Sequence, residues 1–122
     1  MDDAALPEVL ARHLDAFNRQ DLDTLLDGFT ADARWVTGTS SFRGRAELAD
    51  LFRGAFPVSP TLRPLSVLAA GDRVAAELRE YLVHDGVPAE FAIAGFYRIE
   101  SGRIAAAKIY REGSADLPRS TR

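Results

Sequence analysis

The sequence predicts an α+β fold, with helices in its first half and an antiparallel sheet in its second. Before Pro57, apolar residues recur every three or four positions, which is the periodicity of amphipathic helices. After Pro60 they alternate, as in strands that bury one face. Turn-forming pairs at 71–72, 85–86 and 101–102 divide this second region at hairpin spacing. Helices followed by a meander of strands are typical of an α+β domain.

Three helices are expected before the sheet. The first carries its apolar stripe over residues 6–17, and His13 lies on that stripe. The second is expected over 22–29, with Asp21 as its N-cap. The third carries its stripe over 48–56, and the prolines that follow prevent it from continuing.

Strands and turns account for the rest of the chain, which we expect to form a single domain over residues 1–122. A turn at 30–33 precedes a short strand at 34–37 and a polar loop at 38–41. The tail at 117–122 is expected to be frayed. The remaining strands are predicted at 61–70, 74–84, 90–100 and 103–112.

Composition excludes several classes of partner. The net charge is −3, so no basic surface is expected, which argues against nucleic acid and anionic membranes. The chain has no cysteine and only two histidines, far apart in sequence, so no metal site is expected. No membrane-spanning run or signal-peptide pattern occurs, and we expect a cytoplasmic protein.

Glu80 is the main anomaly of the sequence. In the strand predicted at 74–84, it shares a face with Val74, Ala76, Leu78 and Leu82, which predicts a carboxylate on a buried apolar surface. One interpretation is a general acid or base whose pKa burial raises toward neutrality. The alternatives are a structural ion pair or a different strand phase.

His13 poses a similar question on the first helix. It is either a satisfied core residue or the catalytic partner of Glu80 across a pocket. If both line one cavity, we expect them to face each other and to titrate as a pair.

Four motifs in succession resemble a known family. They are Ala16-Phe-Asn-Arg-Gln-Asp-Leu-Asp23, Phe29-Thr-Ala-Asp-Ala33, Phe42-Arg-Gly-Arg-Ala46 and Gly102-Arg-Ile104. They are similar to signatures of the nuclear transport factor 2-like superfamily, and within it of SnoaL-like cyclases, ketosteroid isomerases and limonene-epoxide hydrolases. The resemblance covers residues 6–112. It implies a cone-like α+β barrel, in which a strongly curved antiparallel or mixed sheet wraps around three helices, with an apolar pocket on the concave face. It also implies a homodimer and no cofactor.

The resemblance carries over only some catalytic positions. His13 matches the oxyanion-hole tyrosine of ketosteroid isomerases, and Thr37 falls where their catalytic aspartate lies. Glu80 matches an acid of the epoxide hydrolases, whose neighbouring arginine is replaced here by Leu78. Their second aspartate, like that of the SnoaL-like cyclases, falls at Ile109.

The remaining candidates are expected to contact a ligand. Trp35 and Thr37 share a strand face that the resemblance places in the pocket, where an indole stacks on flat ligands. Each aromatic candidate is alternatively core filler, and Lys108 alternatively a solvated or interface lysine. The predicted substrate-binding residues are Phe17, Trp35, Thr37, Tyr97, Lys108 and Tyr110.

Two functions therefore stay open. The first is a SnoaL-like enzyme that performs proton-transfer chemistry, such as cyclisation, isomerisation or epoxide or water addition, on a hydrophobic carbonyl-bearing or polycyclic small molecule. The alternative is a non-catalytic ligand-binding or dimerisation module, which the residues at Thr37 and Ile109 favour. A homodimer is expected through an apolar outer sheet face. That face is predicted to carry Ala92, Ala94 and Phe96 beside Ala105, Ala107 and Ile109.

Overall fold

The structure, a computed structural model, describes residues 6–112 and contains three α-helices and six strands in that part of the chain. In chain order the elements are α1 (Glu8–Asn18), α2 (Leu22–Asp27), β1 (Phe29–Thr37), β2 (Ser40–Arg43), α3 (Gly44–Ala55), the 3₁₀ turn η2 (Phe56–Val58), β3 (Thr61–Ala70), β4 (Arg73–His84), β5 (Val87–Glu100) and β6 (Arg103–Glu112). The predicted frayed tail lies outside the described residues. Within residues 6–112, no helix is long and apolar enough to cross a membrane.

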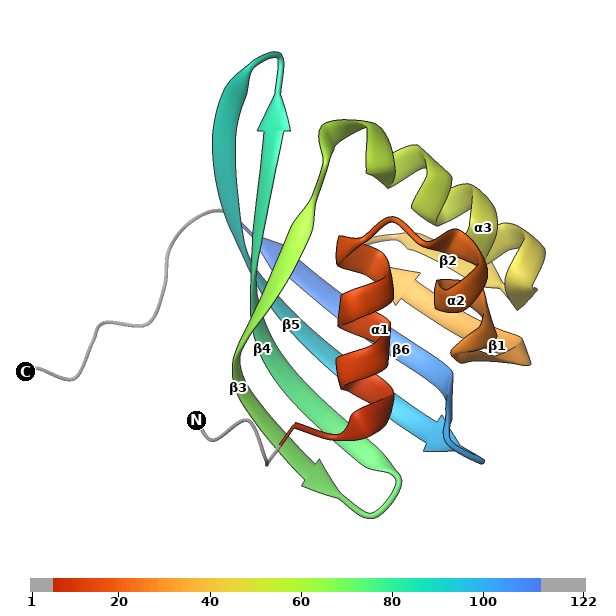
Figure 1. Cartoon of the computed structure of the whole chain (residues 1–122). Coiled ribbons are helices and arrows are strands. Elements are labelled where there is room, and N and C mark those ends of the chain that lie inside the picture. Colours follow the sequence, from red (N-terminus) through yellow and green to blue (C-terminus); the bar gives the residue numbers. More distant parts are fainter. Residues whose placement is uncertain (1–5, 113–122) are drawn as a thin grey trace, which may run out of the picture.

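The strands form one mixed sheet in the order β2-β1-β6-β5-β4-β3. All neighbours are antiparallel except β1 and β6, which are parallel. The three helices lie on one side of the curved sheet (Figure 1). The predicted α+β class is therefore confirmed. The sheet is open, with β2 and β3 as its edges, so it does not close into a barrel.

The predicted boundaries differ most between the second and third helices. Phe29 was expected to end the second helix, but α2 ends before Gly28 and Phe29 begins β1, where it is fully buried beside Ile104. Residues 30–33 are therefore strand, not turn, and the register of β1 with β6 shifts between Phe29 and Arg34. The predicted loop at 38–41 contains the start of β2, whose exposed serines have no apolar alternation to reveal a strand.

The turns predicted at 85–86 and 101–102 are present in the structure. Asp85, Gly86, Ser101 and Gly102 all have positive φ, as type I′ hairpin turns require. Asp21 caps α2 as predicted, because its side chain accepts a hydrogen bond from the Thr24 amide.

Asn18 ties the end of α1 to the edge of the sheet. Its side-chain amide donates to the carbonyl of Leu62 at 2.9 Å, and its oxygen accepts from the Leu62 amide at 2.7 Å. An edge strand lacks one neighbour, so this pair of bonds replaces a missing ladder contact of β3.

We expect replacement of Asn18 by Ala to lower the free energy of unfolding by about 1–2 kcal/mol, because two hydrogen bonds between α1 and β3 are lost. Urea unfolding measures this. Asn18→Asp is the control, since it keeps the acceptor and loses the donor, and should cost less than Ala. Equal stability of all three proteins would contradict the assignment.

Candidate active site in the cavity between the helices and the sheet

A cavity of about 320 Å³ lies between the helices and the concave face of the sheet. Its walls are mainly aliphatic and aromatic side chains from α1, α3, η2 and the strands. The polar exceptions are His13, Thr37, Glu80, Tyr97 and Arg111. An apolar cavity with a few convergent polar groups is the usual form of a small-molecule site.

Glu80 extends into this cavity from β4, on the predicted face of the strand. Val74, Ala76 and Leu78 on the same face are buried, and the Glu80 side chain is 13% exposed. Arg111 compensates its burial, because Nε and Nη2 both lie 2.9 Å from the same oxygen, Oε1. Within residues 6–112 the second oxygen, Oε2, has no hydrogen-bond partner.

Arg111 was not anticipated from the sequence. Its guanidinium lies 4.0 Å from the ring centroid of Phe91, which adds a cation–π contact to the ion pair. Ile93 of β5 is in register with Arg111, and Ile93 also lines the cavity. Arg111 lies two residues beyond Ile109 and shares its face, but the faces of this strand are not separated by alternation in the sequence, so no sequence signal revealed it.

His13 lies in an aromatic cluster and not in an ion pair. It is 3% exposed, and its ring centroid lies 5.6 Å from that of Phe29, 5.8 Å from Trp35 and 6.2 Å from Tyr97. Its Nδ1 is buried and has no hydrogen-bond partner within the described chain. Burial lowers the pKa of His13 from 6.5 to about 4, so the imidazole is neutral at pH 7.

Within residues 6–112, His13 and Glu80 make no ion pair or hydrogen bond with each other. Both residues line the same cavity, but Glu80 is held by Arg111, and burial is the sole cause of the lowered pKa of His13.

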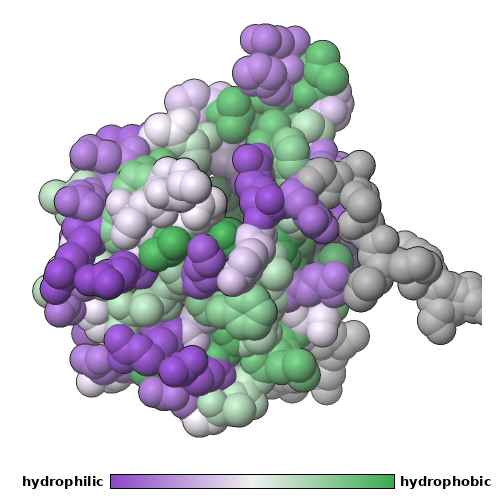
Figure 2. All heavy atoms as spheres, turned by 180° about the vertical axis from the view of Figure 1, so that it is seen from behind, coloured by the Kyte–Doolittle hydropathy of each residue, from purple (hydrophilic) through white to green (hydrophobic). Residues whose placement is uncertain are grey.

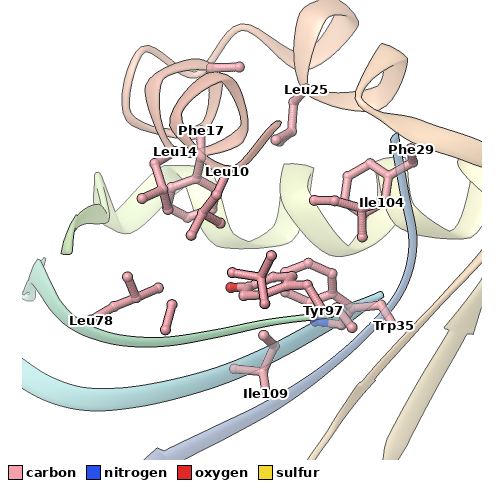
Figure 3. Close-up of a cluster of buried hydrophobic side chains, with 14 of the residues drawn as sticks. Leu10, Leu14, Phe17, Leu25, Phe29, Trp35, Leu78, Tyr97, Ile104 and Ile109 are labelled. Atoms are coloured by element: carbon pink, nitrogen blue, oxygen red, sulfur yellow. The ribbon is translucent and has the colours of Figure 1, made fainter. Parts of the chain in front are cut away.

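The cavity also brings together most of the predicted ligand contacts. Figure 3 shows Phe17, Trp35 and Tyr97 in the region between α1 and the sheet. Burial raises the pKa of the Tyr97 phenol, which therefore stays protonated. The predicted residues that line this cavity are His13, Phe17, Trp35, Thr37, Glu80 and Tyr97.

Lys108 and Tyr110 were predicted as ligand contacts, and for this cavity the prediction is wrong. They pair with Phe96 and Ala94, on the outer face of the sheet. Tyr110 is 54% exposed, and the Lys108 ammonium lies 5.1 Å from the centroid of its ring. Two wider hollows, of about 930 and 490 Å³, are lined in part by Lys108, but neither contains His13 or Glu80. His13 and Glu80, the candidate catalytic residues, line the smaller apolar cavity.

Among residues 6–112, no group of three or more His, Cys, Asp or Glu side chains is placed to hold a metal ion.

The fold and this cavity define the class of the protein. A curved open sheet with three helices over its concave face is the ketosteroid isomerase-like fold, and the apolar cavity lies between those helices and the sheet. Residues 10–107 match the model of the SnoaL-like domain, and the chain belongs to that family.

Solved structures support the same fold. A candidate polyketide cyclase from Sinorhizobium meliloti is 23% identical over 89% of this chain and 99% of its own, with a TM-score of 0.77. An LEH-like epoxide hydrolase of M. tuberculosis is also 23% identical, over 85% of this chain and 80% of its own, with a TM-score of 0.77.

A third similar structure is an epoxide hydrolase/cyclase-like enzyme with a role in pyran ring formation in the polyether salinomycin. It is 19% identical over 86% of this chain and 88% of its own, with a TM-score of 0.80. Among curated proteins, none matches the chain. At these identities the structural likeness shows the fold alone.

Proposed function

We propose that this SnoaL-like protein is an enzyme that performs proton-transfer chemistry on a hydrophobic small molecule, with Glu80 as the group that takes the proton. The observation that carries the proposal is the unpartnered Oε2 of Glu80 in an apolar cavity. A carboxylate oxygen without a partner on the wall of an apolar cavity can accept a proton from a bound molecule when the two lie within hydrogen-bond reach.

Arg111 prepares Glu80 for this role. Its two nitrogens both contact Oε1 at 2.9 Å and so orient the carboxylate, which leaves Oε2 without a partner within residues 6–112. Because the arginine also stacks on Phe91, the carboxylate is fixed before a ligand enters. Such preorganisation is what positioned general bases require.

Three reactions fit a single base in this cavity. Glu80 can take a proton from carbon beside a carbonyl, from water that opens an epoxide, or from a hydroxyl group that closes a ring. Proton loss from carbon gives an enolate, whereas proton loss from water or a hydroxyl accompanies formation of a C–O bond as an epoxide C–O bond breaks. Glu80 then returns the proton to carbon or to the oxygen of the opened epoxide. Neutral His13 and Tyr97 line the cavity and can hydrogen-bond the substrate oxygen. The names of the similar cyclase and epoxide hydrolase structures support the last two reactions.

The alternative is a non-catalytic ligand-binding module of the same fold. Thr37 and Ile109 line the cavity, and Glu80 is the sole acidic residue among the described residues that do so. A second acid for the oxygen that leaves is therefore absent from the described walls.

Turnover assays separate the two functions. We would incubate the protein with cyclic epoxides, hydroxy-epoxides and β,γ-unsaturated ketones, and follow binding by fluorescence of Trp35, the single tryptophan of the chain and a cavity residue. Product formation supports the enzyme. Saturable binding without product across the panel supports the module.

We also propose a homodimer, through a surface that differs from the predicted one. Ala105, Ala107 and Ile109 were expected outside, but all three are buried. The outer face, seen in Figure 2, has hydrophobic residues among hydrophilic ones. A row of residues in register crosses five strands of this face: Val36, Lys108, Phe96, Ala75 and Leu68. We name it the outer row.

Light scattering at micromolar concentration is expected to give the mass of two chains for the wild type and of one chain for Phe96→Glu. Phe96 is 51% exposed at the centre of the outer row, so a charge there would be buried in the interface. Val87→Glu is the control, because Val87 is 62% exposed at the β4–β5 turn, outside the row. A monomeric wild type would refute the dimer.

A further inference from the structure

Two polar groups on the walls of the cavity have no partner in the part of the chain that the structure describes. Nδ1 of His13 is buried and has no hydrogen-bond partner within residues 6–112. Tyr97 is 3% exposed and lines the same cavity, and within residues 6–112 its hydroxyl makes no hydrogen bond. A buried polar atom such as His13 Nδ1 costs free energy when it has no partner, and a tyrosine hydroxyl in an apolar site usually finds one. Orphaned groups that line one cavity indicate that a ligand supplies the missing hydrogen bonds.

Gly95 determines where the Tyr97 hydroxyl lies. A Cβ atom on Gly95 would be 2.5 Å from the Tyr97 oxygen and 2.7 Å from Cε1 and Cζ of its ring. The ring therefore lies folded back along β5, directly over Gly95. The φ of Gly95 is not positive, so glycine is needed here for space and not for backbone conformation.

The folded ring aims its hydroxyl across the floor of the cavity. In Figure 3 the Tyr97 oxygen points along the sheet toward the side of Leu78, beneath Leu10, Leu14 and Phe17 of α1. Leu78, Phe17 and Tyr97 all line the cavity. The hydroxyl therefore lies where it can contact a molecule bound between α1 and β4.

We propose that Tyr97, seated on Gly95, donates a hydrogen bond to an uncharged oxygen of the ligand, and that Gly95 is a specificity-determining position of the cavity. The ligand class is a neutral, apolar molecule of one or two rings with a carbonyl, ether, epoxide or hydroxyl oxygen. This rests on the proposed function in so far as the ligand is the substrate, but the recognition itself requires no turnover.

The charges on the cavity walls and the volume of the cavity define this ligand class. Arg111 is the one cationic side chain on the cavity walls among the described residues, and Glu80 already holds it. A carboxylate beside the neutral His13 and Tyr97 would be buried without a counter-ion, which is costly. A cavity of about 320 Å³ is at the lower end of the range for ligand pockets, so four fused rings are disfavoured.

Three probes with the same two-ring skeleton test the proposal: 2-decalone, decalin and decahydro-2-naphthoate. Dissociation constants would be measured by Trp35 fluorescence and calorimetry. The wild type should bind 2-decalone about 5–10 times more tightly than decalin, as one net hydrogen bond provides, and the carboxylate most weakly. Tyr97→Phe should abolish the preference for the ketone and leave decalin affinity unchanged.

Gly95→Ala tests whether the position of the Tyr97 ring depends on the absence of a side chain at Gly95. Because the new methyl group displaces the ring, it should lower 2-decalone affinity at least as much as Tyr97→Phe. It should also lower stability, and this loss should be smaller in a Tyr97→Ala background, where no ring is displaced. Gly54→Ala is the matched control, since a Cβ there meets nothing within 4 Å.

An unchanged ketone-to-decalin ratio in Tyr97→Phe would overturn the proposal, as would tighter binding of the carboxylate. Failure of 2-decalone to bind at its solubility limit would overturn the ligand class. A Tyr97-dependent ketone preference in a protein without turnover would sustain this inference and refute the enzyme, so the two failures are distinguishable.

Discussion

Replacing Glu80 by Gln should lower kcat by about 10²–10⁴, the usual contribution of a positioned proton-transfer group. Gln keeps the length of the side chain and an oxygen that accepts from Arg111, so the free energy of unfolding should change by no more than about 1 kcal/mol. Steady-state kinetics on any substrate found in the turnover panel and thermal unfolding measure the two quantities.

Glu77→Gln is the matched control for this change. It removes a carboxylate from the same strand, but Glu77 is exposed and pairs in register with Ala94 on the outer face. Its kcat should equal that of the wild type. Retention of full activity by Glu80→Gln would refute the proposed base.

Glu80→Leu separates function from structure. The Arg111 side chain is 44% exposed and can turn into water when its partner is lost, so the leucine variant should be inactive but as stable as the wild type, or more stable. A loss of several kcal/mol would instead mark the ion pair as structural.

The periodicity of strands and helices correctly predicted that Glu80 and His13 lie on the inner faces of their elements, where both line the cavity. Glu80 lies on the cavity side of β4 because the side chains of a regular strand alternate, and β4 pairs with β5 without a register shift. His13 is buried because it lies on the apolar stripe of α1. Periodicity could not predict that Arg111 would pair with Glu80, since the two residues are 31 positions apart in the chain.

Irregular strands explain the wrong assignments. The register of β5 and β6 shifts between Arg98 and Ile99, and β6 begins with Ile104 and Ala105 both buried, so alternation does not separate its faces. Lys108 therefore could not be assigned to a face from the sequence. Phe29 fits the apolar pattern of a helix as well as that of a strand. In the folded protein it pairs with Ile104, 75 positions later in the chain, and therefore belongs to β1.

Stability should fall as the pH decreases from about 6.5 to about 4, by roughly 3 kcal/mol from His13 alone. The folded protein keeps this imidazole neutral, because burial lowers its pKa from 6.5 to about 4. In the unfolded chain the same group takes up a proton below 6.5. The unfolded state therefore binds more protons in this window, and stability rises with pH through it. The difference between the two pKa values sets the size of the effect.

Urea unfolding at a series of pH values, compared between His13→Leu and the wild type, measures this contribution. The variant should lose less stability than the wild type between pH 6.5 and pH 4, because it lacks the imidazole that takes up a proton on unfolding. The other histidine provides the control, since the His84 side chain is 73% exposed at the β4–β5 turn and His84→Gln should keep the wild-type pH dependence. If the His13→Leu curve instead paralleled that of the wild type across this window, protonation of His13 would not be coupled to unfolding, and the neutral imidazole assigned to the cavity would be wrong.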